Sequence, residues 1–162
     1  AVLKRVRHEE MYGFSRAITL IDEDALDLSK NPDKAQEEFE ANPPTSLDRR
    51  AQVAHSIVHR WLMKVVDCLY DGRLKYQEHI EQALNRAEKL ANVEASVHRR
   101  HGFGLGEAWM MIAQAEVAFQ RLEWYRSRPQ EFTELIRVVT DAKQLAMDAG
   151  SKKAEGYALT VS

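Results

Sequence analysis

Two histidines, His55 and His59, stand four residues apart in a segment whose apolar spacing predicts a helix, which puts their imidazoles one turn apart. That spacing binds a metal ion when two further ligands converge on the pair. If the chain folds back near residues 71–73, position n lies opposite roughly position 144 minus n. Arg86 and Lys89 then lie beside the histidines, and neither side chain ligates a metal. The sequence therefore predicts no metal and no cofactor, and it places the histidines at the surface or half-buried.

Two other patterns suggest phosphate chemistry. Arg50 precedes His55 by five residues, a spacing found in helical-bundle ribonucleases whose Arg and His act on a scissile phosphate, but a chain with this many Arg and His residues produces it by chance. The segment from Gly102 to Gly106 has the glycine content of a phosphate loop, yet it follows a helix and lacks the Lys-Ser or Lys-Thr of such loops. We expect Gly102 instead to end a helix in the left-handed conformation.

Cationic side chains are expected to gather at one end of the fold. In the hairpin register residues 48–50 lie opposite residues 94–96, and the next helix starts close by with unsatisfied N–H donors. We name the resulting cluster the basic pole and predict that it binds an anion or a partner. Its members are Arg49, Arg50, His98, Arg99, Arg100 and His101.

One helical stripe changes from apolar to ionisable along its length. In chain order it contains Ile80, Leu84, Ala87, Ala91, Glu94, His98 and His101. A buried, unpaired Glu94 would cost several kcal/mol, so this carboxylate is either exposed beyond the core or paired with a cation. The exposed helix end is the favoured interpretation, and His98, one turn later, is the nearest cation for the alternative.

The elements that position these residues are helices, because apolar residues recur at steps of three and four through nearly the whole chain. The predicted helices cover roughly residues 3–26, 32–39, 45–71, 73–101, 105–126 and 130–149. Short connections make neighbouring helices antiparallel. The expected fold is all-α, an up-down antiparallel helical bundle of four long helices plus one short acidic helix. We expect one domain over residues 1–162, with the short acidic helix and linker at 31–46 and a tail at 151–162.

The helix predicted over residues 105–126 is apolar around more than half of its circumference. Such a helix is central or faces a partner, and its large apolar side chains point in more directions than a four-helix core covers. We therefore predict an interaction surface that comprises Trp109, Met110, Ile112, Val117 and Phe119.

Charge is distributed unevenly in a chain whose formal net charge is −2. The segment 22–40 holds eight acidic residues and two lysines, which suits either a solvated surface or an acidic strap that engages a basic pole. No apolar run approaches the roughly 20 residues that a membrane span needs. The one cysteine, Cys68, excludes an intrachain disulfide and favours a reducing, cytoplasmic setting.

These observations rank three functions for a soluble protein. The first is a non-enzymatic helical protein–protein interaction or self-assembly module that binds a protein partner or itself, as a homo-oligomer. The alternative is a nucleic-acid or phosphate-binding regulator that uses Arg49, Arg50, Arg99 and Arg100, although a sequence pI near 6.3 argues against strong nonspecific binding of nucleic acid. A metal-dependent or ribonuclease-type helical-bundle enzyme is third.

Overall fold

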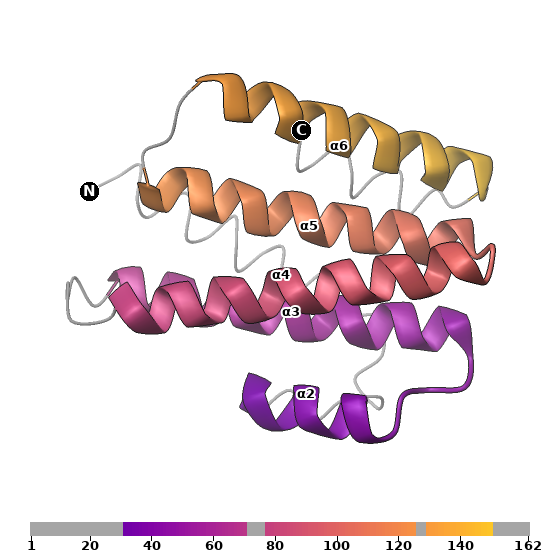
Figure 1. Ribbon diagram of the computed structural model, residues 1–162, viewed down its shortest axis with the longest axis horizontal. Coiled ribbons are helices and arrows are strands. Elements are labelled where there is room, and N and C mark those ends of the chain that lie inside the picture. Colours follow the sequence, from indigo (N-terminus) through magenta and orange to yellow (C-terminus); the bar gives the residue numbers. More distant parts are fainter. Residues whose placement is uncertain (1–30, 71–76, 126–128, 151–162) are drawn as a thin grey trace. The chain divides into compact units, whose positions relative to one another are not determined.

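The computed structural model describes residues 31–70, 77–125 and 129–150 of the 162-residue chain (Figure 1). These residues form helices and no strand, namely α2 (Pro32–Ala41), α3 (Leu47–Tyr70), α4 (Gln77–Arg100), α5 (Gly104–Tyr125) and α6 (Pro129–Asp148). The predicted all-α class, with four long helices and one short acidic helix, is confirmed. The helix predicted over 3–26 and the tail 151–162 lie outside the described residues. The chain divides into two compact units, Ala1–Asn31 and Pro32–Ser162, and all five described helices belong to the second.

Local sequence signals set the helix ends. Pro32 is the first residue of α2, where its missing N–H is not needed. The α3 helix begins after Ser46, whose carbonyl accepts a hydrogen bond from the Arg50 N–H at 2.8 Å. Gly102 has a φ of 65° and ends α4 as predicted, with hydrogen bonds from the Gly102 N–H to the Arg99 carbonyl and from the Phe103 N–H to the His98 carbonyl.

Three of the long helices pack against one another, and the other two helices lie outside them. The α3, α4 and α5 helices are in mutual contact, α6 packs on α5, and α2 packs on α3 (Figure 1). The α4 and α5 helices are antiparallel, because Gln114 on α5 bonds to Asn92 on α4 while Arg121, further along α5, bonds to the earlier Asn85. The central position of α5 explains its apolar circumference.

This arrangement corrects the predicted interaction surface. Trp109, Met110, Ile112 and Val117 are buried inside the unit, and only Phe119 is exposed, at 36%. The reason is that α3, α4 and α6 together surround α5 more completely than we expected from a four-helix core. Of the described helices, not one combines the length and the apolar character that a bilayer crossing requires.

Candidate partner-binding groove

The basic pole is built around a two-point ion pair between α3 and α4. The Arg50 guanidinium donates from Nε to Glu94 Oε2 at 2.7 Å and from Nη2 to Glu94 Oε1 at 2.9 Å. The predicted hairpin register is therefore correct, but Glu94 is not an exposed helix end, because only 2% of its side chain is accessible. Its cation is Arg50 and not His98, whose Nε2 lies 4.0 Å from Glu94 Oε2. The hydrogen bond to Glu94 raises the pKa of Arg50 further above its usual value, so the pair stays ionised on the Arg50 side.

The other members of the basic pole lie either at the surface or in the core. Arg99 donates to Glu107 at 2.6 Å, so a second arginine of the set already holds a carboxylate. Arg49, Arg100 and His101 are exposed. Two of the six members are therefore neutralised within the chain, which weakens the pole as a site for a phosphate or a nucleic acid.

His98 is fully buried at the junction of α4 and α5, so it is not available to a ligand. Its ring packs against that of Phe103, with centroids 5.7 Å apart, and beneath Gly106, where an added Cβ would stand 2.6 Å from His98 Nδ1. Neither ring nitrogen has a hydrogen-bond partner among the described residues. Burial lowers the pKa of His98, opposed by Glu94 and reinforced by Arg50, so the imidazole is held neutral.

The pair His55 and His59 faces α5 and not the α4 residues that the register predicted. Both side chains are buried, and His55 Nε2 lies 3.5 Å from Glu116 Oε2, with the Trp109 ring centroid 5.1 Å from that of His55. Burial lowers the pKa of His59, while Glu116 acts in the opposite direction. Within the described ranges, no three His, Cys, Asp or Glu side chains are placed to hold a metal ion together. Arg50 and His55 lie beside different carboxylates, Glu94 and Glu116.

The site that the sequence analysis missed is the groove in which α2 lies. We define the α3–α4 groove by the side chains of Arg50, Trp61, Lys64 and Arg86, which contact α2. At the start of α2 the Asp33 carboxylate lies between two cations, 3.6 Å from Lys64 Nζ and 3.3 Å from Arg86 Nη1. The Asp33 carboxylate of α2 is thus paired with one cation from α3 and one cation from α4.

The centre of the contact is a buried polar bond. The Trp61 indole Nε1 donates to Gln36 Oε1 at 3.0 Å, and both side chains are buried. The Lys64 ammonium and the Arg86 guanidinium lie 5.1 and 5.6 Å from the centroid of the Trp61 ring, within cation–π range. A buried indole N–H without its acceptor would be costly, so this bond selects for Gln36 in preference to an apolar side chain of similar size.

The end of α2 is held by an aromatic contact. Phe39 is 5% exposed, and the Arg50 guanidinium carbon lies 5.8 Å from the centroid of its ring. Because the same guanidinium binds Glu94, the ion pair between α3 and α4 also forms part of the floor on which α2 rests. Ala35, next to Gln36 on the buried face of α2, completes the contact.

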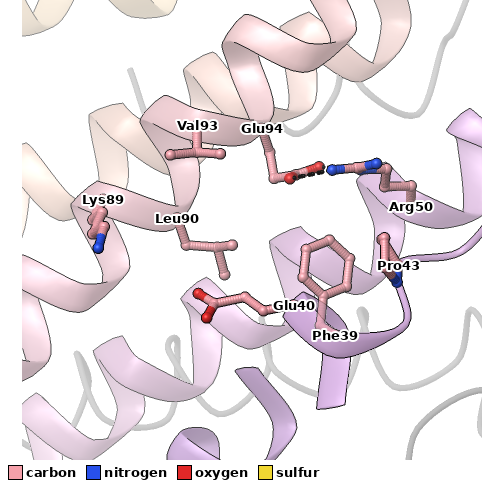
Figure 2. Close-up of a pocket in the computed structure, with 8 residues that line it drawn as sticks. All are labelled: Phe39, Glu40, Pro43, Arg50, Lys89, Leu90, Val93 and Glu94. Atoms are coloured by element: carbon pink, nitrogen blue, oxygen red, sulfur yellow. Dashed lines mark hydrogen bonds and ion pairs between the residues drawn. The ribbon is translucent and has the colours of Figure 1, made fainter. Parts of the chain in front are cut away.

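A pocket of about 170 Å³ opens beside Phe39, between the end of α2 and the face of α4 (Figure 2). Phe39, Leu90 and Val93 give it apolar walls, and the Arg50–Glu94 pair closes one end. Glu40, Pro43 and Lys89 complete the lining. Val93 is 50% exposed, so α2 covers only part of the apolar surface that α4 offers here.

A signal for this groove was present in the sequence. Ala35, Gln36 and Phe39 share one face of the short helix, and Trp61 has Lys64 three residues later on the same face of α3. The high net charge of the segment favoured a solvated surface and concealed that face. No protein-family model, curated protein or solved structure matches the chain, so the interpretation of the groove rests on its own geometry.

Proposed function

We propose that the chain is a non-enzymatic helical protein–protein interaction module that binds an acidic amphipathic helix in the α3–α4 groove. The buried hydrogen bond between Trp61 and Gln36, flanked by the Asp33 contacts with Lys64 and Arg86, is the observation that carries the proposal. Trp61 provides a buried aromatic side chain and a hydrogen-bond donor, and Lys64 and Arg86 provide two cations in the same groove. Aromatic and arginine side chains dominate the energetics of protein interfaces.

The α2 helix has the properties of an exchangeable occupant. It has ten residues, and helices of that length are marginal in water without tertiary contacts. Three of its residues are buried, Ala35, Gln36 and Phe39. Each ion pair of Asp33 is partly exposed and contributes at most about 1 kcal/mol to holding α2 in place. Segments with few buried contacts open locally at a small fraction of the free energy of global unfolding.

The groove also supports self-assembly, because α2 of a second copy has the same complementary residues as α2 in place. A homo-oligomer formed in this way is one form of the proposed function, within a reducing, cytoplasmic setting that suits the lone Cys68. Light scattering across protein concentration tests it, and a molar mass that stays that of one chain at high micromolar concentration contradicts this form.

The two rival functions have weaker support. A regulator that binds phosphate or nucleic acid needs the basic pole, in which Arg50 and Arg99 are already paired with carboxylates. An enzyme needs convergent reactive groups, whereas His55 and His59 are both buried and His55 lies against Glu116 and Trp109. Adding a nucleic-acid competitor to the light-scattering experiment separates self-assembly from the regulator.

The direct test uses a fluorescent peptide of residues 31–46 and the full-length protein. In the wild-type protein the linker 42–46 joins α2 covalently to α3, so this tethered α2 competes with the added peptide for the groove. Its effective concentration is on the order of millimolar, so the peptide is expected to bind weakly. Phe39→Ala in the protein weakens the tethered helix and is expected to increase peptide affinity about tenfold, because more of the groove is free. Gln36→Ala is the second such variant and acts on a different contact.

Phe119→Ala is the matched control, because it removes an exposed phenylalanine from α5, outside the groove. Its peptide affinity is expected to equal that of the wild type. Absence of binding to both the Phe39→Ala and Gln36→Ala proteins would remove the proposed function.

A further inference from the structure

The pocket beside Phe39 extends beyond the end of α2. Asn42 follows the last residue of α2, and Pro43 and Pro44 stop the helix because neither has an N–H to donate. Pro43 nevertheless lines the pocket beside Phe39. Position 43 lies seven residues after Gln36 and four after Phe39, so a continuous helix would present it on the same face as both.

The linker to α3 prevents α2 from extending by another turn into this pocket. Residues 42–46 must connect the end of α2 to the start of α3, which runs in the opposite direction along the groove, as the pairs Gln36–Trp61 and Phe39–Arg50 show. Another turn of helix would consume the residues that make this reversal (Figure 1). A helix from a separate chain has no such constraint.

We infer that the preferred occupant of the α3–α4 groove is a partner's acidic amphipathic helix at least one turn longer than α2, with an aliphatic side chain that fills the pocket. The inference rests on the proposed function and adds the length and pattern of the ligand. Numbered as in α2, that helix has an acidic residue at position 33, Gln at 36, an aromatic residue at 39 and Leu, Ile or Met at 43. The α2 segment of this chain has the required residues at positions 33, 36 and 39, but the fourth position is occupied by Pro43.

The pocket chemistry selects the fourth side chain. Its walls at Leu90 and Val93 are apolar, and Arg50 and Glu94 at its end bond to each other. The other charged residues of the lining, Glu40 and Lys89, are exposed to solvent. An aliphatic group therefore enters without leaving a buried charge unpaired. The pocket has a volume of about 170 Å³ with Phe39, Glu40 and Pro43 in place, and the matching residues of the partner helix supply that side of it.

Three peptides of residues 31–47 separate pocket filling from helix propensity. The first has the native sequence, the second carries Pro43→Ala with Pro44→Ala, and the third carries Pro43→Leu with Pro44→Ala. The second and third have similar helix propensity and differ in the side chain that reaches the pocket. Binding to the full-length Phe39→Ala protein is measured by fluorescence anisotropy, with the Gln36→Ala protein as a second host.

The Pro43→Leu peptide is expected to bind about tenfold to a hundredfold more tightly than the Pro43→Ala peptide, from the burial of one aliphatic side chain. Adding Val93→Asp to the protein introduces a charge at the half-exposed edge of the pocket and is expected to abolish this difference while the native peptide still binds.

Equal affinity of the Pro43→Leu and Pro43→Ala peptides, or a gain that survives Val93→Asp, would overturn the inference and leave the proposed function in place if the native peptide binds. Failure of all three peptides to bind either host would overturn both.

Discussion

Arg50 on α3 and Glu94 on α4 form a two-point ion pair, at 2.7 and 2.9 Å, whose guanidinium also lies 5.8 Å from the centroid of the Phe39 ring on α2. One cation therefore connects three helices. It fixes the register of the α3–α4 hairpin, neutralises a buried carboxylate and supports the end of the helix that occupies the groove.

Arg50→Ala is expected to lower the free energy of unfolding by about 3 kcal/mol, because it leaves the buried Glu94 carboxylate without its cation. The matched variant is Arg99→Ala, which breaks a pair whose arginine is exposed and is expected to cost about 0.5 kcal/mol or less. Urea unfolding of both variants measures the difference. Equal losses in the two variants would show that burial of Glu94 does not govern this pair.

Stability is expected to fall as the pH drops below about 6.5, the ordinary histidine value. Burial lowers the pKa of His59 and of His98 in the folded protein, so the unfolded chain binds more protons between the folded pKa and 6.5. Stability therefore increases with pH across that window and is constant with respect to these groups above it. Thermal unfolding from pH 5 to 8 measures the slope. His59→Gln and His98→Gln are each expected to reduce it, so a slope unaffected by both changes contradicts the assignment.

Two glycines of the α4–α5 junction are expected to respond oppositely to alanine. Gly106→Ala places a Cβ 2.6 Å from both His98 Nδ1 and Phe103 Cδ1, and is expected to destabilise the fold by about 1–3 kcal/mol. Gly104→Ala meets no atom within 4 Å at the start of α5, and is expected to be neutral or stabilising by up to about 1 kcal/mol. Chemical denaturation distinguishes them, and a tolerated Gly106→Ala would mean that His98 can move away.

Trp61→Phe is expected to loosen α2, because it removes the indole donor and leaves the buried Gln36 side-chain oxygen without a hydrogen bond. Limited proteolysis within the linker 42–46 reports this opening, since cleavage there follows the population of the detached state. The variant is expected to be cut about tenfold faster than the wild type. Adding Gln36→Leu removes the unsatisfied oxygen and is expected to restore much of the protection; a double variant cut as fast as Trp61→Phe alone contradicts this role of the bond.

Local patterns were sufficient to predict the helices and the hairpin register, because capping residues, glycines and apolar spacing act within a few turns of chain. The register alone placed Arg50 opposite Glu94, as observed. The burial of Glu94 was not predictable from its own helix, since it depends on a cation that arrives from α3.

The groove was harder to predict from the sequence, because its residues come together only when α2, α3 and α4 are all in place. Trp61 and Lys64 belong to α3, Arg86 belongs to α4, and Asp33 reaches both only when α2 folds back through the linker 42–46. Similarly, Trp109 and Met110 looked unpartnered until the positions of α3, α4 and α6 around α5 were known. Tertiary placement determined both outcomes.

Exchange of charges across the groove tests the central claim most directly. The Phe39→Ala protein, in which the weakened α2 leaves more of the groove free, receives Lys64→Glu with Arg86→Glu, and the peptide of residues 31–46 receives Asp33→Lys, so that the paired charges are reversed on both sides. At low ionic strength each change alone is expected to weaken binding about tenfold, and the two together to restore it. Binding of the native peptide that is unaffected by the protein change, or a doubly reversed pair no tighter than either single reversal, would contradict recognition of an acidic helix by the α3–α4 groove.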